Sequence, residues 1–374
     1  MNKAHTLPSN SSSLLARLLA LGTLAATAAV SHLGAQTGYT VVDLSTAGGF
    51  DSAADTSAGV TVGSTATRPS LVTRAALWNG TTYSDLHPTA LLGSSTTARS
   101  TATSVANGVQ VGSGLGPNTS NRMVGLVWRG TAESAATLLA PFATYSTTAL
   151  GTDGTQVVGS AIGFARDGTT TDAGHAMLWD LATGAVVDLG LSAQALGVAG
   201  GQQVGQIVKG TVNAALWRGT SKSLVVLHPK NATSSSAAAT DGVRQVGTSI
   251  YDVRIRSEAA NGNHNALFTY ATVWSGTATS AIIIHDGRFR HTYATGVSGP
   301  NISGYGADNS ALGTPAYYHA LVWDANGVAT DLNAFLPAGF VGSQALSVDS
   351  AGYVSGYMMT ATGERHAVVW IPNL

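Results

Sequence analysis

The stretches HAMLW (175–179), HALVW (319–323) and HAVVW (366–370) repeat one short pattern at three distant points of the chain. Each ends in tryptophan, and all seven tryptophans of the 374 residues end a run of this kind. The remaining four runs are RAALW at 74–78, VGLVW at 124–128, NAALW at 213–217 and YATVW at 270–274. Alanine or glycine stands three positions before each tryptophan, and leucine or valine directly before it. A chain that places every tryptophan in one register is a repeat protein.

Further elements recur in a fixed order between the tryptophan runs. An apolar segment that often ends in Asp-Leu comes first, as in VVDL at 186–189, and a strand of small residues follows, as in SAQALGV at 192–198. A glycine-containing turn then leads into a Val-Gly strand, as in QQVGQ at 202–206. Glycine supplies the positive φ of tight hairpin turns. Each repeat is therefore predicted to hold four strands, in the order small-residue, Val-Gly, tryptophan and Asp-Leu.

The spacing of the repeats favours a closed ring. Successive tryptophans lie 50, 51, 38, 57, 49 and 47 residues apart, which is typical of propeller blades. Small side chains suit the narrow axis of such a ring, and a tryptophan can bury its area between neighbouring sheets. TVVDL at 40–44 has the pattern of an Asp-Leu strand, but no other strands of a repeat precede it. HAVVW at 366–370 has the pattern of a tryptophan strand, but no Asp-Leu strand follows it. These two segments are expected to pair, which removes exposed sheet edges.

The sequence thus predicts an all-β fold, a seven-bladed β-propeller of four-stranded antiparallel blades, closed by pairing of N-terminal and C-terminal strands. Six or eight blades are the alternative, because HNALF at 264–268 resembles a degenerate further copy before YATVW. A single propeller domain is expected over residues 36–374.

The HAxxW run, the Asp-Leu run and the Val-Gly strand together resemble the HAF-type repeats of bacterial probable extracellular proteins. Three copies keep the leading histidine, at His175, His319 and His366. The phenylalanine of the family's third position is Met177, Leu321 or Val368 in these copies. The resemblance extends over roughly residues 40–374. It implies a secreted repeat protein of bacterial type and brings no catalytic residues with it.

The N-terminus has the pattern of an export signal. Lys3 and Arg17 precede an apolar stretch at 18–30, and cleavage is expected after Ala28 or Ala35. The alternative is a buried N-terminal helix. Residues 1–35 are therefore predicted to be a signal peptide, and the mature protein to be secreted or periplasmic, without a membrane span. The chain has no cysteine, which excludes disulfides and thiolate metal sites. Only 10% of its residues are charged and its net charge is -1, so it has no basic excess to bind the phosphates of a nucleic acid.

The recurring polar residues are expected to serve the fold. His175, His319 and His366 stand at equivalent positions of three repeats, which are spread around a ring and converge on one metal ion only if they face its axis. Hydrogen bonding at the start of a strand is therefore the expectation. Asp43, Asp85, Asp188 and Asp331 recur once per repeat, which favours turn capping over a calcium site. His87-Pro88 and His228-Pro229 are expected to be turns. We identify no catalytic motif, and no cofactor or metal is expected.

One repeat differs from the others. It carries YDVRIRSE at 251–258 and HDGRFRH at 285–291, whose loops are expected to open on one face of the ring. Arginine beside an aromatic residue suits recognition of a carboxylate or a sugar, whereas a solvated loop or an ion pair between blades is the alternative. Neighbouring loops would add Phe164, Arg166, Asp167 and Tyr305. The predicted ligand-binding residues are Arg254, Arg256, Asp286, Arg288, Arg290, His291, Tyr317 and Tyr318.

These observations favour a non-enzymatic module that binds an extracellular glycan or protein. Two alternatives remain. A polysaccharide-acting hydrolase or lyase would need two carboxylates, or a carboxylate with histidine or tyrosine, over the central funnel. A purely structural cell-surface protein would have no pocket.

Overall fold

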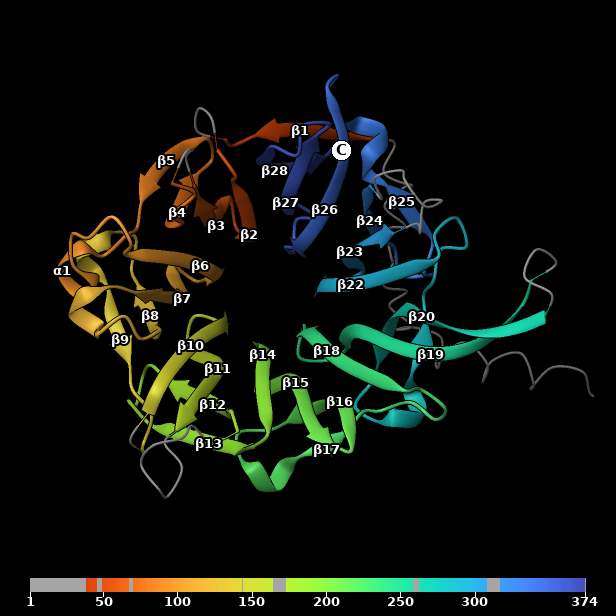
Figure 1. Cartoon of the computed structure of the whole chain (residues 1–374), viewed down its shortest axis with the longest axis horizontal. Coiled ribbons are helices and arrows are strands. Elements are labelled where there is room, and N and C mark those ends of the chain that lie inside the picture. Colours follow the sequence, from red (N-terminus) through yellow and green to blue (C-terminus); the bar gives the residue numbers. More distant parts are fainter. Residues whose placement is uncertain are drawn as a thin grey trace, which may run out of the picture. The chain divides into compact units, whose positions relative to one another are not determined.

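A computed structural model describes residues 38–373 except 46–48, 67–69, 143, 164–172, 258–261 and 308–316. The described residues form seven four-stranded sheets whose neighbouring strands are antiparallel. The sheets surround one axis as the blades of a propeller (Figure 1). The fold predicted from the repeats is confirmed. The predicted signal peptide at 1–35 lies outside the described residues, and no described helix is long and apolar enough to cross a membrane.

The first strand of every blade lies beside the axis, and the strands then run outward in the order of the repeat. Blade 1 consists of β2 (Ser52–Ser57), β3 (Val60–Thr65), β4 (Arg74–Asn79) and β5 (Thr82–Asp85). Blade 2 consists of β6 (Arg99–Ala106), β7 (Val109–Leu115), β8 (Val124–Trp128) and β9 (Ala136–Leu138). Blade 3 consists of β10 (Thr144–Thr152), β11 (Gln156–Gly163), β12 (His175–Asp180) and β13 (Val186–Leu191). Blade 4 consists of β14 (Ala193–Ala199), β15 (Gln202–Lys209), β16 (Thr211–Trp217) and β17 (Val225–Val226).

Blade 5 consists of β18 (Ser234–Thr240), β19 (Gln245–Ser257), β20 (Gly262–Trp274) and β21 (Ile282–Ile283). Blade 6 consists of β22 (His291–Ser298), β23 (Asn301–Ala307), β24 (Tyr318–Trp323) and β25 (Ala329–Asp331). Blade 7 joins both ends of the described chain, with β26 (Phe340–Val348), β27 (Val354–Thr360), β28 (Arg365–Pro372) and β1 (Tyr39–Asp43). Helical elements are short in the described part: α1 (Thr89–Leu92) and 3-10 turns at Pro117–Thr119, Ala132–Ser134, Ser221–Ser223, Ala278–Ser280 and Leu332–Phe335.

The ring closes in the way that the split repeat predicts. Strand β1 pairs with β28 in antiparallel register, with Val41 opposite Trp370 and Asp43 opposite Val368. The HNALF segment is not an eighth copy, which settles the blade number at seven. It belongs to β20, which runs on without a break to Trp274 and pairs along its whole length with β19.

One tryptophan seals each boundary between blades. The buried apolar residues form seven clusters, each made of two neighbouring blades and each containing the tryptophan of the second blade. All seven tryptophans are at most 3% exposed. Burying a side chain of this size contributes roughly 4–6 kcal/mol. The ring is therefore stabilised mainly between its sheets, around these tryptophans.

The Val-Gly motif has a steric cause beside the axis. In every blade its glycine lies opposite an alanine of the first strand, next to a β-bulge. A Cβ at these glycines would lie 1.8–2.0 Å from a carbonyl oxygen of the first strand. No side chain fits at that distance, so glycine is required. The seven positions are Gly63, Gly112, Gly159, Gly205, Gly247, Gly304 and Gly356.

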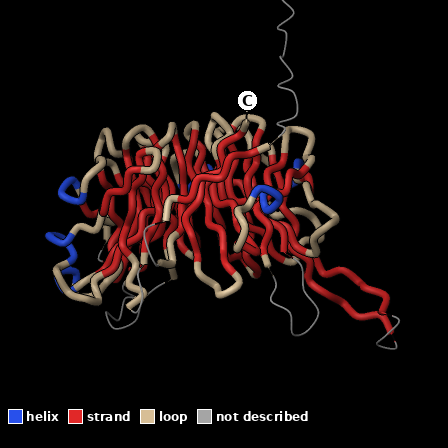
Figure 2. The backbone as a smooth tube through the Cα atoms, turned by 90° about the horizontal axis from the view of Figure 1, so that it is seen from above, coloured by secondary structure: helices blue, strands red, loops and turns tan. Residues whose placement is uncertain are grey.

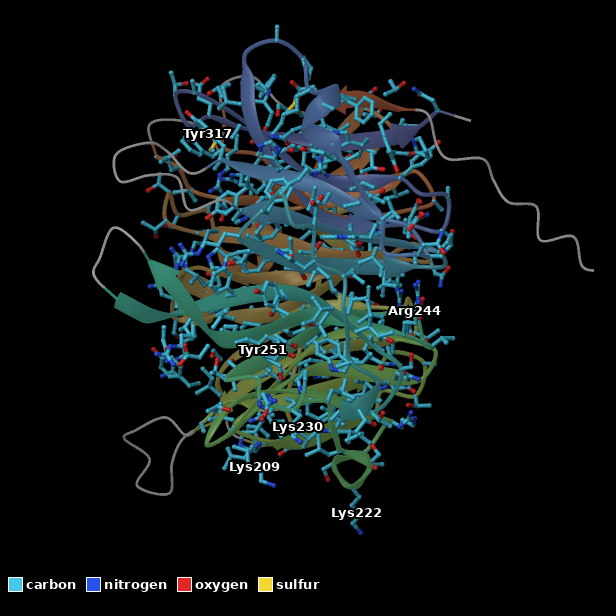
Figure 3. All side chains as sticks on the ribbon, turned by 90° about the vertical axis from the view of Figure 1, so that its right-hand side faces the viewer. Lys209, Lys222, Lys230, Arg244, Tyr251 and Tyr317 are labelled. Carbon is cyan, nitrogen blue, oxygen red and sulfur yellow. The ribbon has the colours of Figure 1, made fainter. Side chains whose placement is uncertain are left out.

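The two ends of the ring differ. We call the end where first strands turn into second strands the turn face, and the opposite end, where second strands lead into third strands, the loop face. Figure 2 shows the long β19–β20 hairpin projecting from the loop face. In Figure 3, Tyr317 lies toward the side from which this hairpin projects and Arg244 lies toward the opposite side.

Replacing one of the seven glycines is expected to disrupt the blade. In Gly159→Ala the new Cβ would meet the Thr148 carbonyl oxygen at 1.9 Å, so we expect a loss of about 3 kcal/mol or more in the free energy of unfolding. Gly287→Ala is the control, because a Cβ there meets no atom within 4 Å. Urea unfolding followed by circular dichroism measures both variants. Equal stability of the two would refute the steric explanation.

Candidate functional site

A cavity of about 380 Å³ lies on the axis of the ring. All seven first strands line it, and the residues that they contribute are mostly small or hydroxyl-bearing, together with backbone. Their lining segments begin at the bulge and run to the following turn, so the cavity belongs to the turn-face half of the axis. The bulge residues at equivalent positions are Ala54, Thr103, Leu150, Leu196, Ala238, Thr295 and Leu346.

Asp55 is the carboxylate of this lining that joins neighbouring blades. Its Oδ2 accepts hydrogen bonds from the Ser104 hydroxyl at 2.8 Å and the Val105 N–H at 2.9 Å, both in blade 2. Its Oδ1 accepts from the Thr56 N–H and from the Ser347 hydroxyl of blade 7. Burial raises the pKa of Asp55, and these hydrogen bonds lower it in part. With its acceptors occupied, Asp55 holds blades 7, 1 and 2 together and is not a free catalytic group.

The leading histidines of the tryptophan strands form hydrogen bonds with the aspartates of the Asp-Leu strands. His175 Nδ1 lies 2.7 Å from Asp188, His319 Nδ1 2.8 Å from Asp331, and His366 Nδ1 2.7 Å from Asp43. The second oxygen of each carboxylate accepts a backbone N–H of the following turn, for instance that of Gly190 at 2.8 Å. The structural role expected for both residue types is confirmed. Their pairing was not anticipated.

In blade 1 an arginine takes the place of the histidine, since Arg74 lies 3.9 Å from Asp85. Asp85 also accepts the N–H of His87 at 2.7 Å. The pairing follows a rule within the sequence. Repeats with His or Arg at the start of the tryptophan strand have Asp before Leu, whereas repeats with Val124, Asn213 or Tyr270 do not. This co-occurrence is the signal from which the pairs could have been found.

A second group of histidines joins neighbouring blades through hydroxyls. His87 Nδ1 and His228 Nδ1 each lie 2.8 Å from a serine hydroxyl, that of Ser100 and that of Ser235 respectively. Each serine oxygen also accepts a backbone N–H from the tryptophan strand of the preceding blade. His285 makes the same contact with Thr292 at 3.1 Å. Because Ser100 and Ser235 are buried, these pairs are not nucleophile sites.

Four of the predicted ligand-binding residues divide into two contact groups on the loop face. Asp286 and Arg288 form an ion pair at 2.5 Å, and Arg288 also lies 3.9 Å from Asp331. The Arg290 guanidinium lies 4.9 Å from the ring of Phe268, which in turn lies 5.9 Å from the ring of His291. Arg288 is therefore bound within the protein, whereas Arg290 and His291 flank the base of the long hairpin.

The remaining predicted residues are more dispersed. Arg254 is exposed on the β19–β20 hairpin, opposite Asn265, and the side chain of Arg256 lies outside the described residues, as do Phe164, Arg166 and Asp167. Phe289, the aromatic residue between Arg288 and Arg290, belongs to the core at 7% exposure. It packs on the His319 ring at 5.2 Å, because the loop turns it inward between blades 5 and 6.

Tyr305 and Tyr318, both predicted at this face, form an aromatic group with Tyr293, which was not predicted. The rings of Tyr293 and Tyr305 stack with centroids 4.6 Å apart, and the ring of Tyr318 stands edge-on to Tyr305 at 5.5 Å. Tyr317 packs beside Gly342 in the next blade. Within the described residues, no three His, Asp or Glu side chains gather closely enough to hold a metal ion.

No family model and no curated protein matches this sequence. Solved structures match its fold. The β-propeller domain of the Trilobed protease from Pyrococcus furiosus, described as having an open velcro topology, is 13% identical with a TM-score of 0.54, over 86% of this chain and 95% of that chain. Pyrococcus horikoshii acylaminoacyl peptidase is 12% identical with a TM-score of 0.53, and the present chain covers 51% of its length.

These matches overturn the expectation of a non-enzymatic binding module for a glycan or protein. The two matched propellers named above belong to peptidases, so that expectation was wrong, and its polysaccharide-acting and purely structural alternatives gain nothing from these matches. At 12–13% identity the likeness shows the fold of this chain. What the chain does is therefore a matter for proposal and experiment.

The histidines between blades make stability depend on pH. Burial lowers the pKa of His285 below the ordinary value of 6.5, so the folded protein resists protonation at this group while the unfolded chain does not. Stability is then complete above about pH 6.5 and is lost as pH falls through the lower pKa of the folded state. We expect the thermal midpoint to drop between about pH 7.5 and pH 5. The thermal midpoint of the His285→Gln variant is expected to drop less over the same pH range. An identical drop in the variant and the wild type would show that His285 is not the group responsible.

Proposed function

We propose that this chain is a peptidase-associated propeller, a ring that receives peptide segments in its axial cavity for a separate catalytic unit. The observation that carries the proposal is the axial cavity within a fold that the matched proteins carry as part of peptidases. A cavity of about 380 Å³ has the size of an ordinary ligand site. It can therefore accept a few residues of extended chain, whereas a folded domain is too large.

The residues that line the cavity favour a peptide as its ligand. Small side chains and the hydroxyls of Thr103 and Thr295 face the cavity together with backbone, and no lysine or arginine belongs to the lining. Thr103 and Thr295 each donate a hydrogen bond to a carbonyl of the next blade, which keeps these side chains in place. Such a wall offers hydrogen bonds without selecting for a particular side chain. This is the behaviour expected of a site that accepts many peptide sequences.

The chemistry of cleavage is assigned to a separate catalytic unit. The chain has no cysteine, and the serines that lie beside histidines, Ser100 and Ser235, are buried and accept backbone N–H groups. The His-Asp pairs of the described residues have their Asp oxygens committed to turns. A ring of this kind acts by admitting or positioning substrate.

Peptide binding in the cavity tests the proposal. A short, fluorescein-labelled, unstructured peptide is expected to raise its fluorescence anisotropy with the protein, whereas a folded protein with the same label is not. Ala238→Trp places a large side chain in the cavity and is expected to weaken peptide binding about tenfold or more. The matched control is Ala136→Trp, on the exposed outer strand β9. Absence of peptide binding, or equal binding by the two variants, would refute the proposal.

We also propose that the chain is an exported protein of the HAF-repeat type. The basic residues before the apolar stretch at 18–30 support this, as does the tryptophan run that recurs seven times, three of them as HAxxW. When the full sequence is expressed in a Gram-negative bacterium, we expect the mature protein outside the cytoplasm, beginning at Ala29 or Gln36. N-terminal sequencing of the fractionated product checks this. An intact N-terminus in the cytoplasmic fraction would contradict it.

A further inference from the structure

Blades 6 and 7 carry tyrosines at a position where the other blades carry small polar residues. The residue after the Val-Gly-type glycine is Tyr305 in blade 6 and Tyr357 in blade 7. At the same register the other blades have Ser64, Ser113, Ser160, Gln206 and Thr248. The sequence shows this change as Ser-Gly-Tyr at 303–305 and again at 355–357. Two adjacent blades therefore share one specialisation.

Three further residues extend this specialisation toward the axis and the loop face. Tyr293 lies opposite Tyr305 on the innermost strand β22, where the equivalent residues of the other blades are Ser, Thr or Gln. Tyr318 begins β24 at the loop face and is 36% exposed. The guanidinium of the exposed Arg365, at the loop-face end of β28, lies 4.5 Å from the Tyr357 ring. We call Tyr293, Tyr305, Tyr318, Tyr357 and Arg365 the tyrosine cluster.

The hydroxyls of the tyrosine cluster make no hydrogen bond to any described residue, although Tyr357 is only 6% exposed. Burial raises the pKa of both Tyr305 and Tyr357, and the charges of Tyr293, Tyr318 and Tyr357 raise that of Tyr305 further. The rings themselves are adjacent, since Tyr305 stacks on Tyr293 at 4.6 Å and meets Tyr318 edge-on at 5.5 Å. None of these hydroxyl oxygens is among the buried unpartnered atoms of the described residues, so solvent reaches the hydroxyls and they are open to a ligand.

Arg365 differs from the arginines that are held by carboxylates. Arg74, Arg244 and Arg288 each form an ion pair with an aspartate. Among the described contacts, the Arg365 side chain has only its position over the Tyr357 ring, which leaves its guanidinium N–H groups available. A guanidinium with free N–H groups can form two parallel hydrogen bonds to a carboxylate.

We propose that the tyrosine cluster binds a carboxylate of a peptide, with Arg365 pairing the charge and the tyrosine hydroxyls donating hydrogen bonds to it. The inference rests on the proposed function, since it names the group by which a peptide is held at the loop-face end of the ring. The carboxylate belongs either to the C-terminus of the peptide or to an acidic side chain. Phenol hydroxyls and a guanidinium can donate hydrogen bonds to either kind of carboxylate.

The experiment compares three short fluorescein-labelled peptides of otherwise identical sequence, one with a free C-terminal carboxylate, one amidated, and one amidated with an internal glutamate. We expect the free acid to bind about tenfold more tightly than the plain amide, because hydrogen bonds to charged groups are strong. Tighter binding of the glutamate peptide than of the plain amide would extend the site to side-chain carboxylates. Binding of all three peptides with one affinity would overturn the inference and leave the proposed function standing.

Variants separate the site from general electrostatics. Arg365→Gln and Tyr305→Phe are expected to abolish or reduce the preference for the free acid, and the phenylalanine keeps the stacked ring. Arg122→Gln is the matched control, because it removes the same charge from a guanidinium that lies 5.2 Å over the ring of Tyr145, elsewhere on the propeller. Thermal midpoints confirm that each variant is folded. If Arg122→Gln lowers the preference as much as Arg365→Gln does, the inference fails.

A small probe distinguishes failure of the inference from failure of the proposed function. N-acetylglycine carries the carboxylate without a peptide chain, and its binding is measured by isothermal titration calorimetry. If it binds to the wild type and not to Arg365→Gln while no peptide binds, the carboxylate site stands and the proposed function falls. If neither N-acetylglycine nor the free-acid peptide binds, the inference is overturned as well.

Discussion

The architecture depends on the close approach of the first two strands of each blade beside the axis. A glycine of the second strand packs against a carbonyl of the first, at a distance that admits no side chain. This contact allows seven inner strands to surround one narrow axis, and the tryptophans fill the wider gaps farther out. The axial cavity is what this arrangement leaves open, and its wall is made of the same inner strands.

The sequence was sufficient for the ring because a repeat multiplies weak signals. One run that ends in tryptophan means little, whereas seven such runs in one register predict the blade, the strand order and the pairing of the chain's two ends. The role of the repeated histidines and aspartates followed from the same logic. Their pairing with one another was missed, although it is visible in the way that Asp85, Asp188 and Asp331 accompany a basic residue at the start of the preceding strand.

The candidate site was harder to predict, because side-chain direction in loops does not follow from the repeat. Arg288 and Phe289 stood in the most highly charged loop, and both are committed to the protein itself, one to Asp286 and one to the core. The tyrosine cluster lay on strands that looked ordinary. Its signal was a departure from the repeat, tyrosine where the other blades have serine, threonine or glutamine. In a repeat protein, an exception to the pattern is therefore a signal to weigh beside local charge.

Asp55 joins the last blade of the ring to the first through a buried carboxylate. Blade 7 is completed at its outer edge by β1, and at the axis it donates the Ser347 hydroxyl to Asp55 of blade 1. The joint is thus fastened at two radii, by backbone pairing outside and by a carboxylate inside. Peeling away the outer strand would leave the inner fastening in place. Blade 7 is thus held at its outer edge by β1 and beside the axis by the Ser347–Asp55 hydrogen bond. If the outer strand detached, the contact beside the axis would still join blade 7 to blade 1.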